Sequence, residues 1–283
     1  MGAAKKCTVR LYVSNIQGSA DVQKLCSLGA RVTGADFVIF NEVNKRPGDE
    51  STFAPLKLKA GFITNTPASG KGPGFGTFLG SPCWDPETDF STLDPDFEIG
   101  VMSRSFFGGI RVTTIGMYRS PNMKNHADID KFYSRVEFYV KQARERLDDV
   151  IFLAGDDNSP TTTGSCYAKS AYQHLEAIRR KFGGEHAITK GTRKGSTGIW
   201  HQPDHVVAFY DSMRCKLRAL APSKGVADHC ELQISADLGY LKVPKQRWFN
   251  KTFVVSEGDP KKIEKDLELI GSTAIEDKLQ EEE

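Results

Sequence analysis

The chain has 283 residues, of which 39% are hydrophobic, 26% charged and 10% aromatic, and this composition excludes a disordered chain. Its 38 basic and 36 acidic side chains give a net charge of +2, which excludes a uniformly basic nucleic-acid coat but allows a local basic groove. The six cysteines have neither CxxC nor zinc-binding spacing, and no apolar run has the length of a signal peptide or membrane span. We therefore expect an intracellular protein with reduced thiols and no membrane partner.

The N-terminal third alternates short apolar runs with amphipathic or irregular stretches. Alternating apolar side chains predict a strand over residues 9–15, and the helical pattern that follows is predicted to end at Gly29. A compact apolar run predicts a buried strand over residues 36–40. Residues 46–100 are rich in glycine, proline, serine and aspartate, which predicts strand pieces joined by long loops.

The rest of the chain contains the longest helical pattern and the most apolar strands. Strands are expected over residues 110–117, 150–154, 206–209, 216–220 and 230–234, and helices over residues 129–147 and 171–182. Many short strands with a few helices between them favour a two-layer β-sandwich flanked by helices over a doubly wound parallel sheet. The highly charged segment after Ser256 predicts a helical or frayed extension without chemistry of its own.

Polar residues at the ends of the predicted strands carry the functional signal. Those that follow an apolar strand are Asn15, Glu42, Tyr118, Asp156 and Asn158, and those that precede or begin one are Asp204, Asp228 and His229. Because one antiparallel strand ends where its neighbour starts, these side chains are expected to gather at one edge of a sheet. Each one alone could be an ordinary turn residue, since Asp and Asn favour turns. Together, carboxylates and an amide oxygen suit Mg²⁺, whereas histidine and cysteine are too sparse for zinc.

Six short motifs occur in the order typical of the endonuclease/exonuclease/phosphatase superfamily. They are N-I-Q-G after the first strand, F-N-E after the second, Y-R-S-P-N, G-D-D-N-S, P-D-H-V-V and A-D-H. Any one motif would be weak, and it is their order over about residues 7–236 that carries the resemblance. Y-R-S-P-N, G-T-R-K-G-S-T, A-D-H-C and the later R-W-F-N-K most resemble the endonuclease domains of LINE-like (non-LTR) retrotransposons.

This resemblance implies a DNase I-like fold of the α+β class. That fold is a four-layer α/β-sandwich, in which two mostly antiparallel sheets pack face to face and helices flank them. The nuclease domain would span residues 1–240, and residues 241–283 would form a charged C-terminal extension or linker. In a longer natural chain this linker would lead towards a reverse transcriptase, and the protein would act in the nucleus.

The resemblance also implies roles for the residues at the strand ends. The ligands of the metal ion, Mg²⁺ with Mn²⁺ as an alternative, would be Glu42, Asn15 and Asp228. Asp156 would orient and deprotonate the attacking water, and Asn158 would hold that water or the phosphate. His229, oriented by Asp204, would donate to a non-bridging phosphate oxygen as charge develops there. Tyr118 and Asn122 would contact the scissile phosphate.

Further polar, cationic and aromatic side chains are expected to contact DNA as the partner. They are Arg119 and Asn122, which follow Tyr118, together with Arg193, Lys194 and Trp200 in the glycine-rich segment 189–200. A duplex needs cations at the rim of an acidic site to meet its backbone, whereas a small phosphate would need only the metal and the pocket. A flexible connector is the alternative interpretation of this segment.

Four positions depart from the superfamily pattern without removing a catalytic group. Gln17 stands where DNA-repair relatives carry an acidic residue, Asn41 replaces Gln, Ala227 replaces Ser, and Asp157, which we expect to point away from the water, replaces an aromatic residue. The main expectation is an active Mg²⁺-dependent DNA endonuclease that nicks one strand. A phosphatase or phosphodiesterase acting on a small or lipid phosphate is the alternative, and a non-catalytic nucleic-acid-binding module is a third hypothesis.

Overall fold

The computed structural model describes residues 7–18, 22–65, 74–106, 109–159, 166–194, 198–212, 215–224 and 228–238. The expected charged extension over residues 241–283 lies outside these ranges, as do Ala227 and the R-W-F-N-K segment. Within them, no helix has the length and apolar character needed to cross a membrane.

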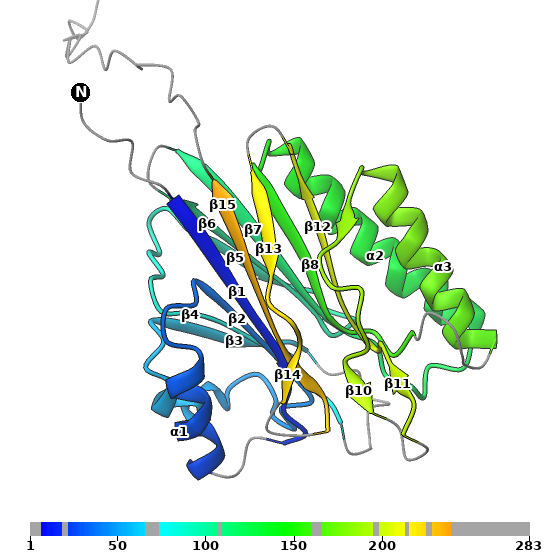
Figure 1. Cartoon of the computed structure of the whole chain (residues 1–283), viewed down its shortest axis with the longest axis horizontal. Helices are drawn as coiled ribbons and strands as arrows, with labels where there is room; N and C mark the ends of the chain where they lie inside the picture. The colour runs from blue at the N-terminus through cyan, green and yellow to red at the C-terminus, as the bar shows by residue number, and fades with distance from the viewer. Residues whose placement is uncertain are drawn as a thin grey trace, which may run out of the picture. The chain divides into compact units, whose positions relative to one another are not determined.

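Two β-sheets form the body of this part of the molecule (Figure 1). The first sheet has the strand order β13-β15-β1-β2-β4-β3, with the short β14 paired to β15 outside this path. Its strands are β1 (Cys7–Asn15), β2 (Phe37–Asn41), β3 (Ala60–Ile63), β4 (Phe78–Ser81), β13 (Lys216–Ala219), β14 (Ser223–Lys224) and β15 (Cys230–Leu238). Neighbouring strands are antiparallel except β1 and β2, which run parallel.

The second sheet has the strand order β5-β6-β7-β8-β12-β9. Its strands are β5 (Phe90–Leu93), β6 (Ile99–Phe106), β7 (Ile110–Tyr118), β8 (Val150–Asp156), β12 (Asp204–Tyr210) and β9 (Glu185–His186). Here β7 and β8 are the parallel pair. A separate antiparallel pair, β10 (Arg193–Lys194) with β11 (Trp200–His201), is called the β10–β11 ribbon below.

Apolar side chains fill the space between the sheets and cover their outer faces. Leu11 and Ile39 of the first sheet meet Phe152 and Val206 of the second in the central layer. The outer face of the second sheet is covered by α2 (His126–Glu145) and α3 (Cys166–Lys181), and that of the first by α1 (Val22–Arg31) and the 3-10 helix η1 (Glu50–Leu56) (Figure 1). The order helix, sheet, sheet, helix confirms the predicted four-layer α/β-sandwich.

The sequence of α2 explains both its start and its orientation. Asn125 lies just before the helix, and its side-chain oxygen accepts a hydrogen bond of 2.9 Å from the backbone N–H of Ala127. The buried side chains recur every three or four residues, at Ile129, Phe132, Tyr133, Val136, Tyr139, Val140 and Ala143. This spacing turns one continuous apolar stripe towards the second sheet.

The first helix differs from its prediction. It does not end at Gly29 but continues to Arg31, and the left-handed position that follows it is Gly34, with φ of +83°. A Cβ at Gly29 would lie 3.4 Å from the carbonyl oxygen of Pro55, at the end of η1. Gly29 therefore lies inside the helix against the end of η1, and it does not end the helix.

Strand direction brings the polar strand ends together. The parallel strands β1 and β2 end at one edge, where Asn15 pairs with Asn41, and β7 and β8 end together where Tyr118 pairs with Asp156. Since β12 is antiparallel to β8, it starts opposite the end of β8, and Asp204 lies directly across from Asp156. The edge is thus built by parallel pairs as well as by the antiparallel pairs that the sequence led us to expect.

Candidate active site

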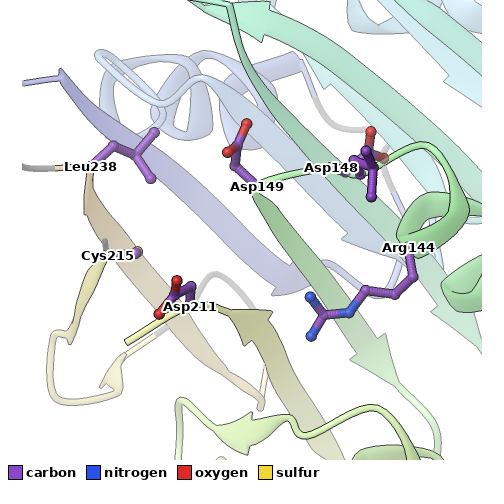
Figure 2. A pocket seen from close by; sticks show the side chains of 7 residues that line it. Arg144, Asp148, Asp149, Asp211, Cys215 and Leu238 are labelled. Carbon is purple, nitrogen blue, oxygen red and sulfur yellow. The ribbon is translucent and has the colours of Figure 1, made fainter. Parts of the chain in front are cut away.

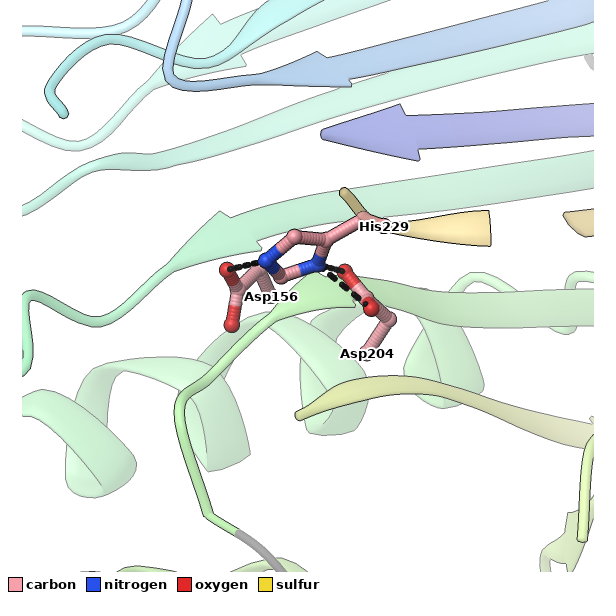
Figure 3. Close-up of side chains that lie close together, drawn as sticks. All are labelled: Asp156, Asp204 and His229. Carbon is pink, nitrogen blue, oxygen red and sulfur yellow. Dashed lines mark hydrogen bonds and ion pairs between the residues drawn. The ribbon is translucent and has the colours of Figure 1, made fainter. Parts of the chain in front are cut away.

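Two buried aspartates and a histidine form the centre of the site (Figure 3). Asp156 and Asp204 are register partners on β8 and β12, and His229 immediately precedes β15. Nδ1 of His229 donates to both carboxylate oxygens of Asp204, at 2.8 and 3.0 Å. Its Nε2 lies 3.9 Å from Oδ2 of Asp156. All three side chains are buried, so the ring is fixed at Nδ1 and its Nε2 faces a second carboxylate.

The charges in this cluster change the proton affinities of its members. Burial, followed by the negative charges of Asp204 and Glu42, raises the pKa of Asp156 to about 8, although His229 and the Asn15 amide act in the opposite direction. Burial alone would lower the pKa of His229, but the charge and hydrogen bond of Asp204, with the charge of Asp156, raise it to about 9. His229 is therefore protonated at neutral pH, and both its ring nitrogens are donors.

Two asparagines of the first sheet hold Asp156 from the opposite side. Nδ2 of Asn15 donates to Oδ2 of Asp156 at 2.9 Å. Oδ1 of Asn41 accepts from the backbone N–H of Asp156 at 3.0 Å, while its Nδ2 donates to the carbonyl of Met117, also at 3.0 Å. Asn41, noted in the sequence only as a departure from the superfamily pattern, therefore joins the two sheets at Asp156.

The backbone around Asp156 depends on Gly155 and on a tight turn. A Cβ at Gly155 would lie 1.9 Å from the carbonyl oxygen of Met117, so no other residue allows β8 to approach β7 here. Oδ1 of Asp156 accepts from the backbone N–H of Asn158, whose φ is +51°, at 3.0 Å. With Asn15 on Oδ2, both oxygens of Asp156 are held in place.

Glu42 and Tyr118 form a second acidic position beside this cluster. The Tyr118 hydroxyl donates to Oε1 of Glu42 at 3.2 Å, and burial, with the charge of Glu42, raises the Tyr118 pKa so that the phenol stays neutral. A Cβ at Gly74 would lie 3.0 Å from Cδ of Glu42 and 3.1 Å from the Tyr118 hydroxyl oxygen. Gly74, with φ of +90°, therefore approaches the carboxylate and the phenol more closely than a residue with a side chain could.

A buried glutamate holds the loop behind Glu42. Oε2 of Glu98 accepts from the backbone N–H of Gly76 at 2.7 Å. Burial, together with the charge of Glu42, raises the pKa of Glu98 to about 8, although the hydrogen bond from Gly76 acts in the opposite direction. The sequence reasoning missed Glu98, because nothing local to its segment marks a glutamate as buried.

Thr192 is a second residue that the sequence reasoning missed. Its hydroxyl donates to Oδ2 of Asp204 at 2.6 Å, and the side chain is fully buried. Its backbone N–H donates to the carbonyl of His201 at 2.7 Å, which ties it to the β10–β11 ribbon. Oδ2 of Asp204 therefore accepts hydrogen bonds from both Thr192 and His229.

The residues expected to bind substrate occupy different places. Asn122 is exposed in the turn after β7, and Lys194 and Trp200 are exposed on the β10–β11 ribbon. Arg119 is instead buried, and its Nη2 donates to the carbonyl of Asn158 at 2.7 Å. Nδ2 of Asn158 donates in turn to the carbonyl of Arg119 at 2.9 Å. These two reciprocal hydrogen bonds connect the segment after β7 to the turn after β8.

Asp157 also has a place in the interior of the protein. Its Oδ2 accepts from the Tyr133 hydroxyl at 3.0 Å, and its Oδ1 accepts from the hydroxyl and backbone N–H of Ser159. Its oxygens thus bond to α2 and to the turn after β8, while those of Asp156 face Asn15 and His229. The extra aspartate of G-D-D-N therefore anchors the turn that follows β8.

Two sets of side chains are candidates for holding a metal ion. Ligand atoms of Asp156, Asp204 and His229 lie within 4.8 Å of one another. The set expected from the resemblance is Glu42, Asn15 and Asp228. Within that set, Oδ1 of Asn15 accepts from the backbone N–H of Gln17 at 3.1 Å, and both oxygens of Asp228 accept hydrogen bonds. Oε2 of Glu42, by contrast, accepts from no residue that the structure describes.

A separate pocket lies at the other end of β8 (Figure 2). It has a volume of about 200 Å³ and is lined by Arg144, Leu147, Asp148, Asp149, Asp211, Cys215 and Leu238. Asp149 directly precedes the first residue of β8, whereas Asp156 is the last residue of the same strand. None of the residues in the candidate active site lines this pocket.

Comparison with known proteins shows similarity at the level of the fold. No protein-family model matches the chain, and no curated protein matches it. An AP endonuclease from Leishmania major is 11% identical, with 81% of this chain and 88% of that chain covered and a TM-score of 0.58. The 3′ phosphatase NExo from Neisseria, bound to a product DNA hairpin, is 12% identical, with 82% and 100% covered and a TM-score of 0.56. An endonuclease/exonuclease/phosphatase family protein from Bacteroides thetaiotaomicron is 10% identical, with 83% and 99% covered and a TM-score of 0.54.

Proposed function

We propose that this chain is a divalent-cation-dependent phosphodiester hydrolase, and specifically an endonuclease that nicks one strand of DNA. The observation that carries the proposal is the line Asp204–His229–Asp156, in which a buried imidazole is held by one carboxylate and faces another. The DNase I-like fold, shared with an AP endonuclease and with a 3′ phosphatase bound to DNA, supports the same chemistry.

Asp156 is suited to accept a proton from the attacking water. Its pKa of about 8 lies near neutral pH, where a general base combines sufficient basicity with a useful fraction of the ionised form. Asn15 and the backbone of Asn158 fix its two oxygens, so the carboxylate need not reorganise when water binds. The water oxygen bonds to phosphorus, and its proton passes to Asp156. The bond from phosphorus to the leaving oxygen breaks, and that oxygen keeps the bonding electron pair and takes up a proton from solvent.

His229 is suited to stabilise the charge that develops on the phosphate. Its Nδ1–H is committed to Asp204, so the Nε2–H remains for a non-bridging phosphate oxygen. A donor that is already oriented and charged before the reaction costs no rearrangement as negative charge grows. Asp204 keeps the imidazole protonated, and Thr192 keeps Asp204 in position.

A divalent cation fits this set of donors. We propose Glu42 as its principal protein ligand, through the Oε2 atom, to which no described residue donates. When bound, the cation would polarise the phosphoryl group and offset the charge of the carboxylates. Mg²⁺ is the proposed ion because the donors are hard oxygens, and Mn²⁺ is the proposed substitute.

DNA is proposed as the substrate because of the β10–β11 ribbon. Lys194 and Trp200 are register partners on this ribbon and both are exposed, Trp200 by 54%. A cation suits the phosphate backbone, and an exposed aromatic ring suits a base or a groove wall. The motif resemblance to LINE-like retrotransposons extends the proposal to a retrotransposon-type endonuclease that acts in the nucleus and is followed by a reverse transcriptase.

Supercoiled plasmid provides the direct test. The protein should convert it to the open circular form with Mg²⁺ and not with EDTA. Asp156→Asn should slow nicking by about 10³-fold while plasmid affinity changes by less than about threefold, since proton transfer is not part of ground-state binding. Asp149→Asn, at the other end of β8, is the matched control and should nick at the wild-type rate.

Other substrates distinguish the competing hypotheses. The protein is also offered a small chromogenic phosphodiester, a 3′-phosphorylated oligonucleotide and vesicles that contain phosphoinositides. Cleavage of both plasmid and chromogenic diester supports the proposal. Hydrolysis of only the 3′-phosphate or only the phosphoinositide would replace the endonuclease with a phosphatase. Plasmid binding without any hydrolysis would instead identify a nucleic-acid-binding module.

A further inference from the structure

The segment that carries Arg193 runs beside the segment that carries His229. The backbone N–H of Cys230 donates to the carbonyl of Thr192 at 2.6 Å, and Arg193 and His229 form an antiparallel bridge pair. The side chain of Arg193 then reaches Asp228, the residue just before His229: its Nε donates to Oδ2 at 2.9 Å, and its Nη2 forms an ion pair with the same oxygen at 2.8 Å. Thr192 and Arg193 therefore contact three consecutive residues around the catalytic histidine.

Asp228 is held from its other side by the first sheet. Its Oδ1 accepts from Nε2 of Gln17, just after β1, at 2.5 Å. The same Oδ1 lies 3.7 Å from Nε2 of His229. Both carboxylate oxygens thus have donors, one from the β10–β11 ribbon and one from the end of β1. Asp228 bridges two parts of the chain that are far apart in sequence, directly beside the imidazole.

This geometry conflicts with a direct role for Arg193 on the DNA backbone. A guanidinium that binds phosphate offers paired N–H groups to it, but Arg193 directs Nε and Nη2 to a carboxylate. Asp228 would also place a negative charge against any phosphate brought to that edge. Lys194, the next residue, is exposed and has no carboxylate partner among the described residues. The two neighbouring cations therefore have different surroundings.

We infer that Arg193 is a positioning residue: it clamps Asp228 and through it fixes the Asp228–Cys230 segment, so that His229 is aimed at the scissile phosphate. The inference rests on the proposed function for the catalytic role of His229. The inference also links the β10–β11 ribbon to His229, because Thr192 and Arg193 lie at the edge of the ribbon and contact the segment that carries His229. Substrate that binds to the ribbon would then also affect the orientation of the His229 ring.

Kinetics on a small substrate test the clamp. Arg193→Ala should lower kcat on a chromogenic phosphodiester by about tenfold or more, with KM within about twofold, because a misplaced group costs rate rather than binding. Arg193→Lys should recover part of the loss. The double variant Arg193→Ala with Asp228→Asn should be no slower than the slower single variant, since both break the same contact.

Arg218→Ala is the matched control. Arg218 also forms a partly exposed pair with an aspartate, Asp237, at 3.2 Å, but on β13, away from the site. The variant Arg218→Ala should leave kcat and KM unchanged. Partly exposed ion pairs contribute little to global stability, so both variants should fold, which circular dichroism checks.

Hydrogen exchange gives a readout that does not depend on activity. The Cys230 amide should exchange about tenfold faster in Arg193→Ala and at the wild-type rate in Arg218→Ala. The clamp would be overturned if the Cys230 amide exchanged at the wild-type rate in Arg193→Ala while only plasmid nicking was slowed and plasmid affinity depended less on salt. Arg193 would then be a DNA contact. If wild-type protein cleaves no phosphodiester but Cys230 exchange still rises in Arg193→Ala, the clamp stands and the proposed function fails.

Discussion

Asp156 and Asp204 lie directly opposite each other on β8 and β12, and the imidazole of His229 lies between their carboxylates (Figure 3). Nδ1 is 2.8 Å from Asp204, whereas Nε2 is 3.9 Å from Asp156. The ring is thus hydrogen-bonded at one nitrogen, while the second nitrogen is beyond hydrogen-bond distance from its neighbour and remains available to a substrate oxygen. The two carboxylates therefore differ in their contacts with the ring, and in the proposed function Asp204 orients the imidazole while Asp156 accepts the proton of the attacking water.

The orienting role predicts the effect of Asp204→Asn. The variant should lower kcat for a phosphodiester by about 10³-fold with little change in KM, because an amide neither orients the imidazolium nor keeps it protonated. Steady-state rates at saturating substrate measure this. Asp148→Asn removes another buried carboxylate, near the start of β8, and should keep its kcat per folded molecule. A kcat for Asp204→Asn within about threefold of wild type would contradict the role.

Thr192 also holds the carboxylate of Asp204, to which its hydroxyl donates a hydrogen bond of 2.6 Å. Thr192→Val keeps the side-chain shape but removes the donor, and it should lower kcat by about tenfold without changing KM. Thr192→Ser keeps the hydroxyl and should retain most of the activity. Equal losses in the two variants would mean that the methyl group, rather than the hydroxyl, is what the site requires.

The residues that share the site could be predicted from sequence, because an apolar run that ends in a polar residue marks the end of a strand. Asn15, Tyr118 and Asp156 lie at such ends, Asp204 begins the strand antiparallel to β8, and the structure brings all four to one edge. The two-sheet architecture followed from the same pattern. These features are local: each depends on a few consecutive residues and on how strands end.

Arg119 and Thr192 depend on partners that leave no local pattern. Arg119 lies in the polar segment Y-R-S-P-N and was predicted to contact DNA, yet it is buried, and its guanidinium donates to the carbonyl of Asn158. Thr192 belongs to a segment that also suits a flexible connector, and its hydroxyl meets Asp204 through long-range pairing. Gly29 likewise serves a contact with Pro55 that sequence spacing does not reveal.

Glu42 is expected to dominate metal binding. Glu42→Gln should abolish nicking at Mg²⁺ concentrations that saturate wild type, while thermal unfolding is little changed because this side chain is only partly buried. Mn²⁺ binding followed by electron paramagnetic resonance should weaken at least about tenfold. Zn²⁺ should not restore activity after chelation, since the donors are oxygens. Tight Mn²⁺ binding by the variant would move the site to the Asp156–Asp204–His229 group.

Lys194 and Trp200, the exposed pair on the β10–β11 ribbon, should contribute to DNA affinity in two ways that can be measured separately. Lys194→Ala should reduce the slope of log affinity against log salt by about 0.9, as expected for one lost phosphate contact. Trp200→Ala should weaken plasmid affinity by about 5- to 50-fold and leave this slope unchanged, because stacking is not ionic. Lys181→Ala, at the end of α3 and paired with Glu137, is the control. An equal slope change in the control would indicate a general charge effect.

Glu176 on α3 predicts how stability depends on pH. Hydrogen bonds from Nε and Nη2 of Arg179, both 2.9 Å, together with His186, outweigh burial and lower its pKa to about 2. Because this value lies below the roughly 4.3 of an unfolded glutamate, its contribution is complete above about pH 4.5 and is lost as pH falls towards 2. Glu176→Gln should lower the free energy of unfolding in urea by about 1–2 kcal/mol at pH 7, and the difference from wild type should shrink steadily below pH 4.5.

Glu145→Gln, which breaks the exposed pair with Lys141, should shift stability only slightly at any pH. A Glu176→Gln difference that stays constant from pH 7 to pH 3 would show that packing, and not the charge, gives this residue its effect.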